Sequence, residues 1–165
     1  MDKYNLTHKW DLWYHSLHIT KWDIQSYNNL FKLQNLYDYK ILQDTFIPFY
    51  YQNGMFFLMK HPMKPIWEDP HNRLGGCLSY KVLYNNIKDT WDFLIQNCIS
   101  ENIFNNDNIN QTINGLSISP KKEFNIIKIW FNCDLSKEFP NYKNDFITNK
   151  FLDIHKFIYR QHIDS

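Results

Sequence analysis

Alternating apolar and polar positions along the chain predict a series of β-strands, interrupted by segments with helical periodicity. Apolar residues at roughly every second position predict strands at residues 6–19, 27–33, 54–63, 77–84, 113–119 and 125–133. Apolar residues spaced three and four apart predict helices at residues 35–46, 89–101 and 145–160. Asn35 and Asp89 are residue types that favour the N-cap position, and each begins one of these helices. The pattern therefore favours an α+β fold.

The connections between the early strands contain two exposed-looking tryptophans. We expect the strands at 54–63 and 77–84 to pair as a hairpin, with the loop at 65–76 as its tip. Trp67 lies in this loop, and Trp22 lies in the loop that joins the first two strands. Because loops carry binding residues more often than regular elements do, both rings are candidates for ligand contact.

The last two strands are expected to pair around a turn at residues 120–122, Pro-Lys-Lys. In the second of them, Lys128 and Trp130 are two residues apart. Side chains alternate between the two faces of a strand, so these two point to the same face. An ammonium group and a large ring are thus expected side by side.

The segment at residues 65–76 cannot be regular structure. Two prolines remove backbone donors and fix φ, and a pair of glycines permits conformations that other residues avoid. Trp67 and Glu68 therefore stand together in a loop. An aromatic face offers stacking and cation–π attraction, and a carboxylate accepts two parallel N–H bonds. A methylated, positively charged guanine would suit both groups; the alternative is a rim tryptophan beside a surface acid.

The composition fits one soluble globular domain over residues 1–165. Hydrophobic residues make up 44% and charged residues 21% of the chain, and a chain of this length can bury roughly 70% of its unfolded surface. Aromatic residues reach 18%, which is more than a core demands, so some rings are expected to face a ligand. The formal charge of +1 gives no broad nucleic-acid footprint, so any phosphate contacts must be local.

No pattern in the sequence predicts a metal site, a membrane span or a catalytic centre. Cys77, Cys98 and Cys133 are widely spaced and lack a Cys-x-x-Cys pair, so the sequence supports neither zinc nor a disulfide framework, and the cytoplasm fits. No signal peptide is present, and the most apolar stretch, residues 47–59, is too short to cross a membrane. We expect no cofactor and no enzymatic activity.

The spacing of the tryptophans resembles that of the eukaryotic translation initiation factor 4E family, which binds the 7-methylguanosine cap of mRNA. The similarity runs from about residue 6 to residue 160. Its strongest pieces are Pro65-Ile66-Trp67-Glu68-Asp69 followed by Asn72 and Gly75-Gly76, the Trp10-x-x-Trp13-Tyr14 pair, and Ile129-Trp130. The resemblance implies a curved antiparallel sheet with three helices on its convex back and the cap in a concave slot.

The resemblance also implies a role for each residue that would hold the cap base. Trp22 and Trp67 would sandwich the methylated base, and Trp130 would contact the N7 methyl group. Glu68 would accept the ring N–H and the amino N–H of guanine. Trp10, Trp13 and Trp91 are expected in the core.

For the phosphates of the cap, the resemblance gives a partial set of cations. Lys121 matches a phosphate-binding Arg of the family. The second phosphate-binding Lys falls on Ile126, so Lys128 or Lys122 is expected to take its part. A basic residue common after the glycine pair is Cys77 here. With fewer cations, the phosphates would be held less tightly.

The convex back of the family docks scaffold and repressor helices on an apolar surface. Its positions map here to Lys40, Asp92 and Gln96, and Leu36 belongs to the same surface. Charged groups at an apolar hot spot repel the usual partner helix. We therefore expect a divergent scaffold protein or none, a monomer, and a viral or otherwise fast-evolving member of the family.

Three functions remain open from the sequence. The leading hypothesis is cap binding in translation initiation. A variant is a regulator that sequesters caps without recruiting a scaffold. The third is a degenerate member that serves as an interaction module without cap binding. A decapping hydrolase is the least favoured alternative, because a cluster of metal-binding carboxylates is missing from the sequence.

Overall fold

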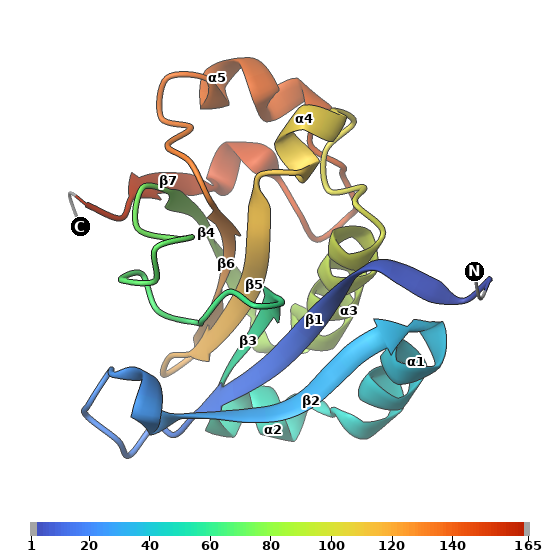
Figure 1. Cartoon of the computed structure of the whole chain (residues 1–165), viewed down its shortest axis with the longest axis vertical. Coiled ribbons are helices and arrows are strands. Elements are labelled where there is room, and N and C mark those ends of the chain that lie inside the picture. The colour runs from blue at the N-terminus through green and yellow to red at the C-terminus, as the bar shows by residue number, and fades with distance from the viewer. Residues whose placement is uncertain (1–2, 164–165) are drawn as a thin grey trace.

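The computed structural model describes residues 3–163, and a curved antiparallel sheet forms its centre (Figure 1). The seven strands are β1 (Asn5–His15), β2 (Tyr27–Asn35), β3 (Met55–Lys60), β4 (Gly76–Leu83), β5 (Ile113–Pro120), β6 (Phe124–Phe131) and β7 (Ile158–Gln161). Their order across the sheet is β2-β1-β3-β5-β6-β4-β7, and each neighbouring pair is antiparallel. The expected α+β fold is confirmed.

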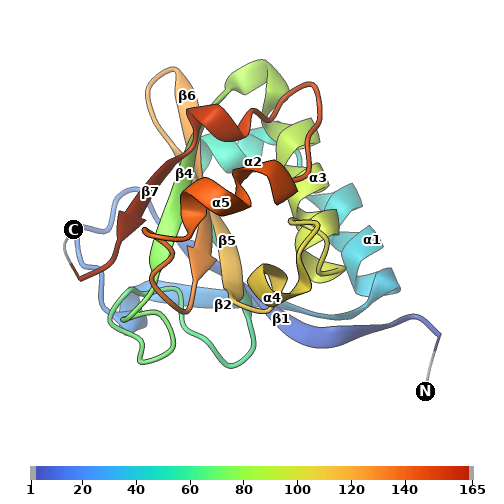
Figure 2. The ribbon, with the colours of Figure 1, turned by 90° about the horizontal axis from the view of Figure 1, so that it is seen from above.

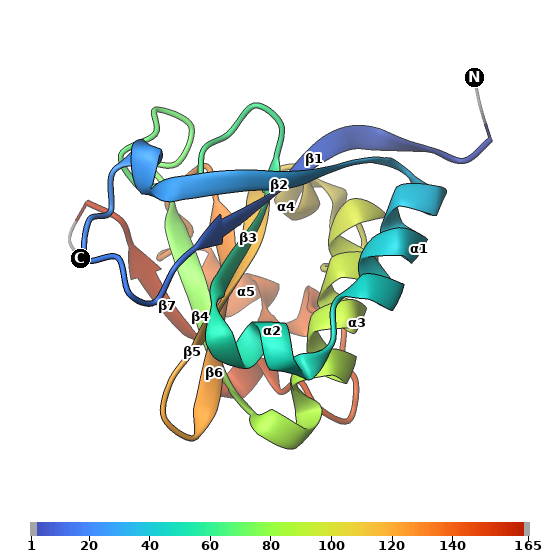
Figure 3. The same ribbon diagram turned by 90° about the horizontal axis from the view of Figure 1, so that it is seen from below.

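Helices cover one face of this sheet (Figure 3), namely α1 (Leu36–Thr45), α2 (Pro48–Asn53) and α3 (Ile87–Ile99). Two shorter helices, α4 (Asp107–Asn110) and α5 (Phe139–Tyr142), and 3-10 turns at 24–26, 84–86, 143–145 and 154–156 complete the described chain. In Figure 2, α5 lies beside β7, where the rings of Phe139 and Tyr159 stack with centroids 6.1 Å apart. Among residues 3–163, no helix is long and apolar enough to span a membrane.

The two longer helices follow from their local sequences. At the start of α1, the side-chain oxygen of Asn35 accepts a hydrogen bond from the backbone N–H of Asp38 at 3.0 Å, which confirms the predicted cap. The predicted cap at Asp89 is wrong, because a 3-10 turn leads directly into α3 and Asp89 lies in its first turn. The face of α3 that packs on the sheet consists of Ile87, Thr90, Trp91, Leu94, Ile95, Cys98 and Ile99.

The sheet separates a large apolar core from a smaller cluster on its opposite face. Trp10 is fully buried in the large core under the helices, whereas Trp13, three residues later, belongs to the smaller cluster. Alternation along β1 explains this division, since residues an odd number apart point to opposite faces. The smaller cluster consists of Trp13, Tyr27, Met55, Phe57, Met59, Cys77 and Trp130. The face away from the helices therefore has an aromatic floor.

The helix predicted at residues 145–160 is wrong. This segment begins at the last residue of one 3-10 turn, contains a second at 154–156, and ends in the edge strand β7, which pairs with β4. Its apolar residues matched helical spacing, but Ile158 is exposed while Phe157 is buried in the large core. Pairing with the open edge of β4 outweighs a weak helical pattern. The third helix on the sheet is α2 instead, which begins at Pro48, a residue suited to the first turn.

The hairpin predicted between residues 54–63 and 77–84 is also wrong. β3 pairs with β1 and β5, whereas β4 pairs with β6 and β7. Residues 61–75 therefore pass over β5 and β6, which at about 4.8 Å per strand is a crossing of roughly 14 Å. Tight hairpin loops contain two to five residues. This loop is longer, so it can connect strands that are not neighbours in the sheet. Because of this crossing, Trp67 lies near residues of β5 and β6 rather than at the tip of a hairpin.

Gly75, at the end of this loop, allows a close approach of two backbones. A Cβ atom on Gly75 would lie 1.7 Å from the carbonyl oxygen of Phe131. We predict that Gly75→Ala lowers the free energy of unfolding by about 3 kcal/mol, the upper end for overpacking. Gly54→Ala is the matched control, because there the obstacle is the half-buried ring of Tyr14, which can move. Urea unfolding of both variants checks this, and equal losses would contradict it.

Candidate functional site

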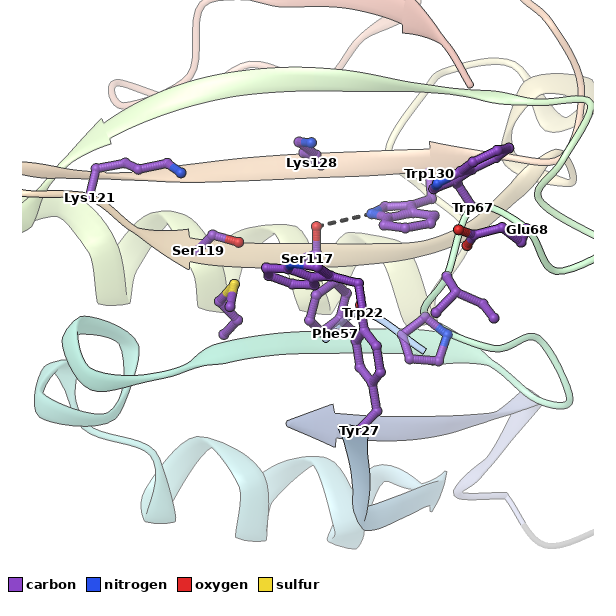
Figure 4. A pocket seen from close by; sticks show the side chains of 13 residues that line it. Trp22, Tyr27, Phe57, Trp67, Glu68, Ser117, Ser119, Lys121, Lys128 and Trp130 are labelled. Carbon is purple, nitrogen blue, oxygen red and sulfur yellow. Dashed lines mark hydrogen bonds between the residues drawn. The ribbon is translucent and has the colours of Figure 1, made fainter. Parts of the chain in front are cut away.

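A cavity of about 440 Å³ opens on the face of the sheet away from the helices (Figure 4). Strands β2, β3, β5 and β6 form its floor, and the loops at 16–26 and 61–75 form its walls. Its lining residues are Trp22, Tyr27, Met55, Phe57, Pro65, Ile66, Trp67, Glu68, Ser117, Ser119, Lys121, Lys128 and Trp130. The two loop tryptophans, the acid and two of the lysines singled out in the sequence are thus brought together.

The cavity has an acidic end and a basic end. Trp67 and Glu68 lie at one end of it, Lys121 lies at the opposite end, and Lys128 lies between them on β6 (Figure 4). Burial, followed by the charge of Glu68, raises the pKa of Tyr27 to about 12, so this phenol stays protonated beside the carboxylate. A ligand with a cationic or N–H-rich head and an anionic tail matches this polarity.

Asp69 organises the loop that carries Trp67. Its carboxylate accepts the backbone N–H groups of Lys64 and His71, both at 2.8 Å, and lies 2.8 Å from Nδ1 of the His71 ring. Its carbonyl accepts the N–H groups of Asn72 and Arg73. Burial acts to raise the pKa of Asp69, but the hydrogen bonds outweigh it and the net shift is downward. The carboxylate is therefore a fixed anchor.

Asn72 ties the same loop to the sheet and to β7. The side chain is fully buried, and its amide donates to the carbonyls of Lys64 at 2.8 Å and Ile66 at 2.9 Å. The amide oxygen accepts from Asn114 on β5 at 2.8 Å, and the backbone carbonyl lies 2.7 Å from Nδ1 of His162. Since Ile66 directly precedes the Trp67-Glu68 pair, these bonds fix where both side chains stand.

The sequence interpretation noticed Asn72 only as part of a motif and missed its partners. Asn114 is one asparagine among many in this chain, and His162 lies far from the loop in sequence. Neither carries a local signal, because their bonds span 42 and 90 residues. Asp69 was likewise noted only as part of that motif, although an aspartate side chain often accepts a hydrogen bond from the backbone N–H two residues later.

Trp22 is positioned by His15. The two rings stack at 4.2 Å with an interplanar angle of 4°, and Trp22 remains 52% exposed. The His15 Nδ1 and Nε2 atoms lie 2.9 Å and 2.8 Å from the carbonyl oxygens of Ser16 and Lys21. His15 thus closes the loop and supports one face of Trp22.

Trp130 forms part of the floor and is held rigidly. Its indole N–H donates to Oγ of Ser117 at 3.0 Å, and its ring contacts Phe57 edge-on at 6.2 Å. It is 7% exposed, so only a small part of the ring can touch a ligand. Lys128 lies two residues away and lines the same cavity, as the alternation in the sequence predicted.

The two lysines of the β5–β6 turn differ in their placement. Lys121 lines the cavity, whereas Lys122 is exposed outside it. The hydroxyl of Tyr84 donates to the carbonyls of both residues and so fixes the turn. Of the cations proposed for phosphate, Lys121 and Lys128 share the cavity, and Lys122 does not.

Cys77 is a buried thiol next to the cavity. Its sulfur lies 2.9 Å from Nε2 of His162, and burial raises its pKa to about 12, so it stays protonated. Arg160 is its register partner on β7 and is exposed. Cross-strand partners point to the same face, so β7 brings a guanidinium beside the position where the basic residue was expected. The sequence interpretation missed Arg160 because it assigned this segment to a helix.

The residues expected to form a partner surface lie on the helical side. Leu36 and Lys40 are exposed on α1, and Asp92 and Gln96 lie on α3. Lys40 forms an ion pair with Asp44 at 2.8 Å, and Asp92 pairs with Lys88 at 2.9 Å. Burial raises the pKa of Asp92, and the lysine acts against this shift. This face therefore carries paired charges between exposed apolar groups.

Comparison with known proteins assigns the chain to a family. The family model of eukaryotic initiation factor 4E matches residues 5–165. The chain belongs to this family. A eukaryotic translation initiation factor 4E homolog of Acanthamoeba polyphaga mimivirus is 31% identical to this family member over 64 residues, which are 39% of this chain. The match spans 24% of that relative's length.

Solved structures of initiation factor 4E proteins share the fold. C. elegans eIF4E-3, in complex with the 4E-binding protein Mextli and a cap analog, gives a TM-score of 0.79 at 18% identity, over 98% of this chain and 94% of that one. Ascaris suum eIF4E-3 with an m7G cap gives 0.77 at 18% identity, over 98% and 93% of the two chains. Within residues 3–163, no group of three or more His, Cys, Asp or Glu side chains is placed to hold a metal ion.

Protonation of the Asp69 carboxylate at low pH should weaken the hydrogen bonds that fix the loop at residues 61–75. Its pKa is lower in the folded state, so its stabilisation is present above the unfolded pKa of about 4 and is lost as the pH falls below it. We predict that Asp69→Asn lowers the free energy of unfolding by about 1–3 kcal/mol at pH 6, and that the difference from wild type shrinks at pH 3. Asp44→Asn, on the surface of α1, is the control. A pH-independent difference in urea unfolding would contradict the assignment.

Proposed function

We propose that this chain binds the 7-methylguanosine cap of mRNA in its concave cavity and acts in translation initiation by binding rather than by catalysis. The observation that carries the proposal is that Trp67 and Glu68 line one cavity with Trp22 and Trp130. Membership of the family and relatives solved with an m7G cap or a cap analog support it. Capped mRNA is translated in the cytoplasm, so the proposal implies that location.

In this proposal, the base lies flat between Trp22 and Trp67. Two rings that each touch a base at about 3.5 Å stand roughly 7 Å apart. A base that carries a delocalised positive charge gains cation–π energy from each ring, on the order of 2 kcal/mol once desolvated, and unmethylated guanine lacks it. His15 covers one face of Trp22, which leaves the other face for the base. The exposed edge of Trp130 then meets the N7 methyl group.

Glu68 reads the pairing edge of guanine, and the lysines read the phosphates. The carboxylate accepts the ring N–H and the amino N–H together, a bidentate pair that adenine cannot supply. The triphosphate runs toward Lys121 and Lys128 at the basic end of the cavity. This polarity, acid at the base and cations at the tail, matches the charge distribution of a methylated guanine nucleotide.

The helical face favours a divergent partner over the usual one. Ion pairs at Lys40 and Asp92 occupy the surface where a scaffold helix would dock, and apolar helices bind poorly over charges. A cap-sequestering regulator is therefore the second candidate function. Affinity capture with the full chain distinguishes the two: a co-purified scaffold protein supports initiation, and capped RNA without a scaffold supports sequestration.

Glu68→Gln tests the proposal directly. Loss of one charge-assisted pair costs about 1.5–3 kcal/mol, so we predict roughly 10- to 100-fold weaker binding of 7-methyl-GTP by calorimetry. Glu123→Gln, an exposed glutamate outside the cavity, should bind like wild type. Wild type should bind unmethylated GTP far more weakly. Equal binding of both nucleotides, or no effect of Glu68→Gln, would overturn cap recognition.

Variants of Lys121 and Lys122 form a matched pair that tests phosphate binding. We predict that Lys121→Ala weakens 7-methyl-GTP binding several-fold and lowers the slope of log affinity against log salt by about 0.7, the value for one phosphate contact. Lys122→Ala should change neither, because its side chain lies outside the cavity. Binding of the 7-methylguanosine nucleoside should be equal in both variants. If Lys122→Ala has the larger effect, the placement of the phosphates is wrong.

A further inference from the structure

A second hollow, of about 500 Å³, lies at the end of β4 and against the C-terminal turns. Its lining residues are Tyr80, Lys81, Val82, Leu83, Asn86, Lys150, Phe151 and Lys156. No acidic residue lines it, and none of its three lysines forms an ion pair within residues 3–163. In a chain with a formal charge of +1, such a cluster is a local basic patch that faces solvent.

Lys81 connects this hollow to the cap cavity. Its register partner on β6 is Ile126, and the partner of Ser79, two residues earlier on β4, is Lys128. Lys81 therefore points to the same face of the sheet as Lys128, at the diagonal spacing of about 7–8 Å. The Lys81 ammonium lies 4.1 Å from the centroid of the Phe124 ring, next to the turn that carries Lys121. Lys81 therefore lines the second hollow and neighbours Lys128 of the cap cavity.

Aromatic rings lie close to two of these lysines, Lys81 and Lys150. The ammonium of Lys150 lies 4.8 Å from the ring of Phe151, and both residues line the second hollow. Phe124 and Phe151 are each partly exposed. Lysines interleaved with accessible rings are the combination that binds single-stranded nucleic acid without sequence preference, because phosphates pair with the cations and bases stack on the rings.

The edge of β4 is open at the same place. β7 pairs with β4 only from Gly76 to Ser79, so residues 80–83 have β6 on one side and no strand on the other among the described residues. The hydroxyl of Tyr80 donates to the carbonyl of Phe151 at 2.7 Å and ties the C-terminal turn to β4. The hollow is thus framed by backbone polar groups as well as by lysines.

We propose that this second hollow binds the RNA that follows the cap. The inference rests on the proposed cap binding, which delivers the first nucleotides to the basic end of the cavity at Lys121 and Lys128. From there the backbone continues past Lys81 to Lys150 and Lys156. A tethered RNA meets these lysines at a high effective concentration, so weak contacts suffice. An acidic peptide added to the open edge of β4 is the competing occupant, but Lys81 points out of the sheet face, toward the cap cavity, rather than along that edge.

Comparison of two ligands tests the proposal. We measure binding of 7-methyl-GTP and of a capped five-nucleotide RNA to wild type and to the triple variant Lys81→Ala, Lys150→Ala, Lys156→Ala. The capped RNA should bind wild type about tenfold more tightly than 7-methyl-GTP, and the triple variant should lose this advantage while its affinity for 7-methyl-GTP is unchanged. Its salt slope for the RNA should fall by about 2, the sum for three phosphate contacts.

A second triple variant controls for net charge. Lys9→Ala, Lys40→Ala, Lys137→Ala removes the same charge from exposed positions outside both hollows and should keep the RNA advantage. The RNA site alone is overturned if the triple variant Lys81→Ala, Lys150→Ala, Lys156→Ala still binds capped RNA more tightly than 7-methyl-GTP. It is also overturned if wild type binds 7-methyl-GTP but does not bind capped RNA more tightly. Failure of wild type to bind either ligand overturns the cap proposal too. Lysine-dependent binding of a polyglutamate peptide without any RNA advantage would assign the hollow to an acidic peptide instead.

Discussion

The buried amide of Asn72 is the interaction on which the site depends. A buried amide that loses its partners costs on the order of 1–3 kcal/mol. The three bonds of the Asn72 side chain, and the contact of its backbone carbonyl with His162, therefore specify one conformation of the loop that crosses β5 and β6. That conformation determines where Trp67 and Glu68 stand over the sheet. Asp69 fixes the other half of the loop through backbone N–H groups. The side chains of Trp67 and Glu68 are therefore presented to the cavity by a rigid support, although both belong to a segment without regular structure.

The two faces of the sheet have different roles, since one packs the main core and the other forms the floor of the cavity. Helices α1, α2 and α3 bury the large core on one face, which supplies most of the apolar burial. The other face keeps a smaller aromatic cluster that serves as the floor of the cavity. Because strand residues alternate, one run such as β6 can contribute Ile127 and Ile129 to the core while Lys128 and Trp130 line the site. The same alternation places Lys81 and Arg160 on the face of the sheet that carries the cavity.

Much of this arrangement could be predicted where the signal is local. Apolar spacing gave α1 and most of α3, alternation gave six strands, and the Pro- and Gly-bounded segment gave the Trp67-Glu68 loop. The C-terminal strand could not be predicted, because residues 145–160 carry helical spacing and only pairing with β4 decides otherwise. The path of the loop at residues 61–75 and the bonds of Asn72 to Asn114 and His162 could not be predicted either. They depend on contacts between residues that are far apart in the sequence.

A crystal structure of the chain with 7-methyl-GTP would test cap binding most directly. We expect the base between Trp22 and Trp67, with the Glu68 carboxylate oxygens at about 2.7–2.9 Å from the ring and amino nitrogens of guanine, and with the loop at residues 61–75 unchanged. A nucleotide bound outside the cavity, or a base whose pairing edge faces away from Glu68, would contradict it.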